Sequence, residues 1–119
     1  MANEIIWTDG KINRNWCPTQ GFTGYTRRGV PIGYVVPHYE QIKVAWDLYG
    51  SNYTNGKLLG HRWHLEWLPD EDWRDDDWTV VEGANCWWKA QNDCEDAYRA
   101  VLAKHGWLDE TFYPRYLEE

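Results

Sequence analysis

Two histidines, His61 and His64, are the first residues of this sequence whose type and spacing could do chemistry. On a helix, residues three apart share a face, and two imidazoles placed there could bind one zinc ion. Apolar and polar residues alternate around these histidines, which predicts a strand, and in a strand residues three apart point to opposite faces. The sequence therefore predicts no metal site and no other cofactor. His38 and His105 have no nearby partner in sequence and are expected at the surface or at a helix cap.

Three cysteines, Cys17, Cys86 and Cys94, are candidates for a nucleophile or a disulfide. Their odd number is typical of reduced, buried thiols, which favours a cytoplasmic protein. Cys94 lies near the expected start of a helix, whose dipole would lower the pKa of its thiol. Spacing alone identifies neither a general base nor an oxyanion hole, and free cysteine is among the most buried residue types. We therefore predict that the protein is not an enzyme, with catalysis by Cys94 or a histidine as the third hypothesis.

Residues 70–77 form the most distinctive segment, in which six carboxylates and one arginine surround a tryptophan. Calcium prefers oxygen ligands, but the segment lacks the glycine and the twelve-residue spacing of a calcium-binding loop. A solvated loop is the simplest interpretation. The hypothesis carried forward is a protein-docking surface, in which the tryptophan is an anchor and the charges accelerate encounter with a basic partner. The predicted binding residues are Asp70, Glu71, Asp72, Trp73, Asp75, Asp76 and Asp77.

Tryptophan supplies 10 of the 119 residues, and a few buried rings of this size can organise a whole core. Trp63 and Trp67 share one face of a predicted strand, about 13 Å apart, a spacing that suits the stacking of sugar rings. Leu65 lies between them, as it would on a hydrophobic core face. A carbohydrate or small-ligand binding domain that uses exposed tryptophans is therefore the second functional hypothesis.

The first part of the chain is expected to form a short hairpin followed by irregular structure. Asp9-Gly10 is typical of a two-residue turn and predicts a hairpin of residues 4–8 and 11–13. One proline and several glycines between residues 16 and 31 would interrupt any helix, so loops and short strands are predicted there.

The middle of the chain predicts one long antiparallel hairpin. Apolar and polar residues alternate between residues 41 and 48, which predicts a strand with one buried face and is preferred over a helix across residues 39–49. Asn55-Gly56 would join this strand to residues 63–67, with an irregular excursion near residues 50–53. The tryptophans expected on the inner face of the hairpin are Trp46, Trp63 and Trp67.

A third hairpin is predicted from residues 78–81 and 86–89, which flank a turn at residues 83–85. In such a strand the adjacent Trp87 and Trp88 would face opposite sides of the sheet.

A helix from about Asp93 to His105 is the most clearly marked element. Asn92 is its predicted N-cap, because a glutamate follows three residues later, and Gly106 suits the left-handed position after the helix end. Residues 107–117 include six apolar or aromatic side chains, too many for a free tail, and are expected to pack back on the sheet. We therefore predict a single domain, residues 1–119, of the α+β class: an antiparallel β-sheet of hairpins with one main C-terminal α-helix packed on it.

The net charge of −7 is unevenly spread along the chain. Residues 1–66 carry 7 basic and 5 acidic side chains, whereas residues 67–119 carry 5 and 14, so that +2 faces −9. Nucleic-acid binding needs clustered Lys and Arg, so no direct nucleic-acid binding is expected, and a partner selected by charge would be basic. No stretch approaches the roughly 20 apolar residues of a membrane span, and the first ten residues do not resemble a secretion signal.

In its small size, its acidity, its lack of a catalytic signature and its ending of strands followed by a capped helix, the chain resembles the small proteins that phages and mobile elements make against CRISPR or restriction systems. This resemblance is one of overall type and covers the whole chain. It implies a stoichiometric, non-enzymatic inhibitor, monomeric or a small homo-oligomer, in the cytoplasm of the host. Such a protein would occupy a basic surface of a protein or ribonucleoprotein complex, or block recruitment of a nuclease.

Overall fold

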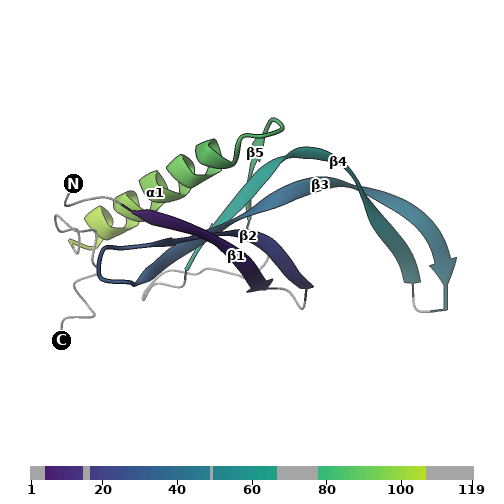
Figure 1. Ribbon diagram of the computed structural model, residues 1–119, viewed down its shortest axis with the longest axis horizontal. Coiled ribbons are helices and arrows are strands. Elements are labelled where there is room, and N and C mark those ends of the chain that lie inside the picture. Colours follow the sequence, from purple (N-terminus) through teal and green to yellow (C-terminus); the bar gives the residue numbers. More distant parts are fainter. Residues whose placement is uncertain (1–4, 15–16, 49, 67–77, 107–119) are drawn as a thin grey trace.

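The protein, described here by a computed structural model, consists of five strands and one helix, and the structure describes residues 5–14, 17–48, 50–66 and 78–106. The strands form one antiparallel sheet in the order β1-β2-β3-β4-β5, and the helix lies across one face of it (Figure 1). This arrangement confirms the predicted α+β class. The elements are β1 (Ile6–Arg14), β2 (Cys17–Tyr25), β3 (Pro31–Asp47), β4 (Gly50–Leu65), β5 (Thr79–Glu82) and α1 (Trp87–Lys104).

The core lies between α1 and the sheet. One stripe of α1 is buried, at four positions spaced four residues apart, and it contacts β3, β4 and β5. Gly33 in β3 allows this close approach, because a Cβ there would lie 2.7 Å from the Sγ of Cys94. The buried cluster consists of Ile5, Ile32, Leu65, Cys94, Tyr98 and Leu102.

The helix begins earlier than the sequence indicated. Cys86 occupies the N-cap position without a side-chain capping hydrogen bond, so the predictions of Asn92 as the cap and of a strand at residues 86–89 are wrong. The reason is the turn after β5, where Gly83 and Asn85 both have positive φ angles, of 117° and 63°, and direct the chain into α1. The end of the helix is as predicted, with Lys104 in its last turn and Gly106 at a φ of 69°. Residues 107–119, including the predicted C-terminal packing segment, lie outside the described residues.

Two dipeptides that predicted turns lie inside strands instead. β1 pairs with β2 continuously from Ile6 to Arg14, so it runs straight through Asp9-Gly10, and Asn55-Gly56 lies within β4. Strand pairing overrides the local turn preference at both places. The loops expected between residues 16 and 31 are largely replaced by β2. The excursion expected near residues 50–53 is a paired part of β4, with one shift of register opposite Asn52 and Tyr53.

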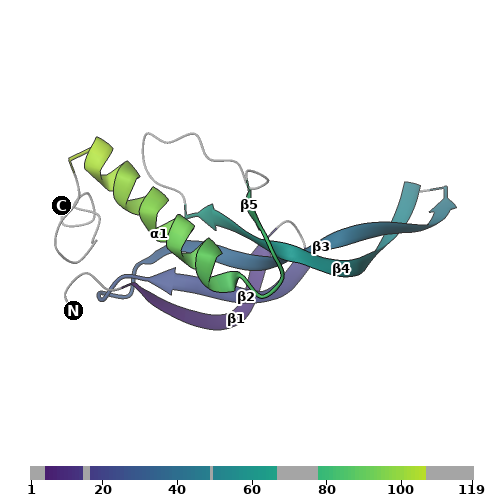
Figure 2. The same cartoon turned by 90° about the horizontal axis from the view of Figure 1, so that it is seen from above.

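β3 and β4 extend far beyond the rest of the sheet. β2 pairs with β3 only as far as Val35, and β5 pairs with β4 only as far as Gly60. Among the described strands, residues 37–47 and 50–59 therefore pair with each other alone, apart from one hydrogen bond that the backbone oxygen of Leu59 accepts from Gly83. This two-stranded ribbon, here called the arm, projects from the body in both views (Figures 1 and 2). Three irregularities in the pairing of β3 with β4 lie within the arm, and irregularities of this kind bend a ribbon and increase its twist.

The arm contradicts the expectation of a buried face between residues 41 and 48. The strand is present, but Ile42, Val44, Trp46 and Leu48 are 42%, 60%, 73% and 97% exposed, because no third strand and no helix among the described elements covers them. Trp46 is therefore not an inner-face residue. Trp63 does pack against the core, as predicted, and Trp67 lies outside the described residues.

Candidate functional site

The predicted docking segment, residues 70–77, lies outside the described residues. By sequence it belongs to the connection from β4 to β5, which are neighbours in the sheet. Its binding role stays a prediction.

His61 and His64 are both buried and lie on opposite faces of β4. His61 shares the helix-covered face with Leu65, and burial lowers the pKa of its imidazole. His64 packs edge-on against Trp78, with 5.3 Å between the ring centroids. Their separation confirms that strand alternation keeps the two imidazoles apart. Within residues 5–14, 17–48, 50–66 and 78–106, no group of three or more His, Cys, Asp or Glu side chains is placed to hold a metal ion.

Cys94 does not have the activated thiol that a position near a helix start suggested. Because α1 begins at Trp87, Cys94 lies well inside the helix, and its side chain is fully buried against Gly33. Burial raises the pKa of the Cys94 thiol, and the neighbouring charges of Glu95 and Asp93 raise it further. The expectation of a lowered pKa is therefore wrong, and Cys94 is a core residue. Cys86 and Cys94 are free thiols.

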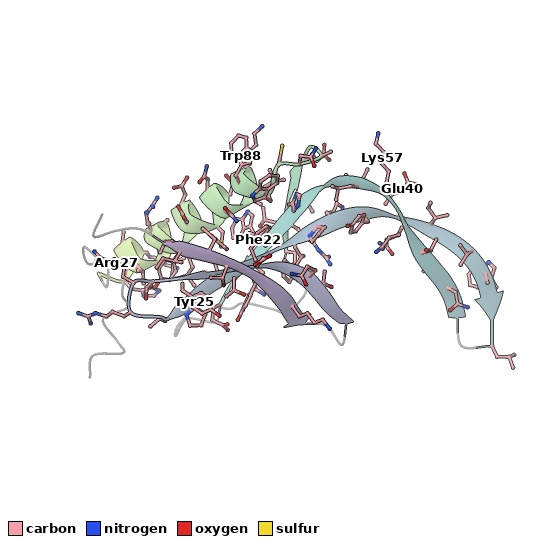
Figure 3. The ribbon with its side chains drawn as sticks, in the orientation of Figure 1. Phe22, Tyr25, Arg27, Glu40, Lys57 and Trp88 are labelled. Carbon is pink, nitrogen blue, oxygen red and sulfur yellow. The ribbon has the colours of Figure 1, made fainter. Side chains whose placement is uncertain are left out.

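The outer part of the arm carries a group of exposed aromatic and basic side chains. The Nζ of Lys43 lies 2.8 Å from the centroid of the Trp46 ring, and Lys43 pairs with Tyr53 on β4. The pairing shifts between Lys43 and Ala45, so Val44 is an extra residue on β3 and the normal alternation of faces is interrupted there. Nearer the body, Glu40 and Lys57 also lie on the arm, away from α1 (Figure 3).

A second exposed aromatic group lies on α1. Trp87 and Trp88 occupy its first turn rather than opposite faces of a strand, and Trp88 projects into solvent at the N-terminal end of the helix (Figure 3). Lys89 lies 5.4 Å from the Trp88 ring centroid. These two tryptophans therefore offer a comparison for Trp46, the single tryptophan of the arm.

A crevice of about 320 Å³ lies at the fork where the arm leaves the sheet. It is formed by side chains from β2, β3 and β4, which meet there because β2 stops pairing with β3 at Val35. No sequence motif predicts this crevice, since its residues come from three strands. The signal that pointed toward it was the basic excess of residues 1–66. The lining residues are Thr19, Pro37, His38, Tyr39, Gln41, Asn55 and Arg62.

Comparisons of the chain with protein-family models, with curated proteins and with solved structures gave no match. None of the helices that the structure describes is long and apolar enough to cross a membrane.

Proposed function

We propose that this chain is a non-enzymatic protein-binding module and that the arm is its main binding element. The observation that carries the proposal is the exposure of Val44, Trp46, Leu48 and Tyr53 on a two-stranded ribbon that stands clear of the core. Exposed apolar side chains that are grouped together, rather than scattered, are typical of interaction sites.

The architecture of the arm supports the proposal that a partner protein covers it. A two-stranded ribbon is only marginally stable in water, and at least three strands or a packed helix are needed for independent stability. Both outer edges of the arm also present backbone N–H and C=O groups that neither β2 nor β5 pairs. Such edges readily pair with a strand of another protein. A protein partner would satisfy these groups and bury the tip side chains together.

Because the chain is acidic, we propose that its partner presents a basic surface. We propose a host nucleic-acid-handling defence complex, which the protein would inhibit stoichiometrically. The net charge of −7 and the acidic segment of residues 70–77 support this partner. In this scheme the acidic segment accelerates encounter and the arm supplies the apolar anchor, since rim charges mainly affect association and buried aromatic residues dissociation.

The two alternative functions have weaker support. Stacking of a sugar needs an open aromatic face, and Lys43 lies over one of the two faces of Trp46, which leaves a single face for a sugar. Catalysis by a cysteine needs an accessible thiolate, and Cys94 is fully buried with a raised pKa.

The proposal is tested by comparing two matched tryptophan variants in capture experiments. Trp46→Ala removes the arm aromatic, whereas Trp88→Ala removes an aromatic of similar type, 49% exposed, on α1. Each variant and the wild type are immobilised and incubated with purified CRISPR effector complexes and restriction enzymes of candidate hosts. We expect the bound complex to be lost with Trp46→Ala and kept with Trp88→Ala. Equal binding by both variants, or binding lost only with Trp88→Ala, would contradict the arm as the binding element.

A further inference from the structure

We propose that the crevice at the base of the arm is a binding site for a carboxylate group, with Arg62 as its principal ligand-binding residue. This inference goes beyond the proposed protein-binding function and does not depend on it, because the crevice lies at the fork rather than on the exposed tip of the arm.

The crevice is built by the divergence of two hairpins. At Gly21 the β1–β2 hairpin still approaches β3 closely, since a Cβ there would lie 2.4 Å from the backbone oxygen of Val35. Beyond this point β2 and β3 separate, and Thr19 faces the arm across the opening. Tyr39 and Gln41, two residues apart on β3, both line this space.

The charge of the crevice is opposite to that of the protein as a whole. Its lining includes one arginine, Arg62, and one histidine, His38, and none of the seven lining residues is acidic. Its volume of about 320 Å³ is at the lower end of the range of about 300–1,000 Å³ for small-molecule sites. The space therefore suits a small anion or a single anionic side chain.

Within the described part of the chain, Arg62 is held as a cation without a counter-ion. Its guanidinium carbon lies 5.2 Å from the centroid of the Trp78 ring, which orients the planar group. The Nε of Arg62 is buried, and the described residues supply neither a hydrogen-bond acceptor for it nor a carboxylate that forms an ion pair with this side chain. Burial lowers the pKa of Arg62, which indicates that its charge is poorly solvated. An anion in the crevice would compensate the charge.

A pair of side-chain amides supplies the second contact. The Nε2 of Gln41 donates a hydrogen bond to the Oδ1 of Asn55, at 2.8 Å, and the Nδ2 of Asn55 is then the donor that the pair can offer to a ligand. A carboxylate has two oxygens in a plane, which match a guanidinium fork together with one further donor. A single arginine with neutral donors suits this monoanion better than a phosphate dianion.

The carboxylate could belong to a free small acid or to an acidic side chain of a protein. The test uses the full chain at constant ionic strength, labelled with ¹⁵N so that the side-chain N–H signals of Arg62 and Asn55 can be followed. The probes are acetate, succinate, inorganic phosphate, and a short peptide with blocked ends and one glutamate. We expect saturable shifts of both signals with at least one carboxylate probe; tighter binding of succinate assigns a free acid, and tighter binding of the peptide assigns a protein side chain.

Two variants make the site falsifiable. Arg62→Lys keeps the charge but removes the planar fork, and we expect carboxylate binding to weaken about tenfold, as loss of one charge-assisted hydrogen bond would give. Asn55→Asp, at an exposed position, should weaken binding by repulsion even if Arg62→Lys fails to fold. Arg28→Lys, at an exposed turn residue, is the matched control and should bind like the wild type. Absent or non-saturable shifts, phosphate binding as tight as the best carboxylate, or unchanged binding in Asn55→Asp would overturn the proposal.

Discussion

The side chain of Lys43 lies over the ring of Trp46, three residues further along the same strand. In a regular strand these two side chains would point to opposite faces. They meet because the pairing of β3 shifts at Val44, where Lys43 pairs with Tyr53 and Ala45 pairs with Asn52. The shift in strand pairing at Val44 therefore brings an aromatic and a basic side chain together on the arm, at a place where no hydrophobic core among the described residues holds them.

The exposure of Trp46 predicts that this tryptophan contributes little to stability. Trp46→Ala should change the free energy of unfolding by no more than about 0.5 kcal/mol, the level expected for an exposed site. Leu65→Ala, which truncates a side chain that is 1% exposed in the core cluster, should cost about 2–5 kcal/mol. Urea melts of the two variants provide the comparison. A loss of more than about 2 kcal/mol for Trp46→Ala would show that the tip of the arm is packed in the free protein.

The contact between Gly33 and Cys94 predicts a strong effect of adding one methyl group. A Cβ at position 33 would lie 2.7 Å from the Cys94 Sγ and equally close to the backbone oxygen of His64, so Gly33→Ala should destabilise the protein by about 1–3 kcal/mol. Gly10→Ala is the control, since nothing lies within 4 Å of its Cβ and alanine should be neutral or stabilising by up to about 1 kcal/mol. Equal melting temperatures for the two variants would mean that α1 packs less closely on β3.

Burial of His61 predicts that stability falls in mild acid. Because burial lowers the folded-state pKa of His61, the unfolded chain binds a proton more readily than the folded protein as the pH falls below about 6.5. The free energy of unfolding should therefore decrease between about pH 7.5 and pH 5.5, and the decrease should be smaller in His61→Gln. Urea melts at several pH values measure this slope. The account of His61 fails if the variant keeps the full wild-type slope.

The acidic segment, residues 70–77, predicts changes in association and dissociation rates that can be measured with the identified partner. Changing Asp75, Asp76 and Asp77 together to Asn should slow association and reduce its dependence on salt, while dissociation changes little. Trp73→Ala should instead accelerate dissociation, if the ring fills a pocket of the partner. Binding kinetics at two ionic strengths distinguish these effects. If the triple variant associates at the wild-type rate and Trp73→Ala dissociates at the wild-type rate, the segment has no docking role and is best interpreted as a solvated loop.

Elements with strong periodicity were predictable from the sequence, and tertiary contacts decided the others. The strand at residues 41–47 and the end of α1 follow from alternation and from Gly106. The start of α1 could not be predicted in this way, because Trp87 and Trp88 have side chains typical of strands and the helix has no side-chain cap. Asn92 is consequently an interior helical residue, at which alanine should be tolerated.

The candidate sites show the same limit. Alternation shows that one face of a strand is apolar and the other polar. The prediction that Trp46 is buried also assumed that a further strand or helix covers the apolar face. Whether such a layer exists depends on how far β2 and β5 extend, which no local pattern encodes. The crevice with Arg62 was missed for a related reason, since three strands bring its residues together at the point where they separate.

The most direct test of the central claim, that the arm is the binding element, is amide hydrogen exchange of the full chain alone and bound to its partner complex. We expect fast exchange in residues 41–55 of the free protein and strong protection there on binding, because these amides lie in an uncovered two-stranded ribbon. The first turn of α1, with the exposed Trp88, should exchange alike in both states. Protection confined to α1, with unchanged exchange throughout the arm, would contradict the account.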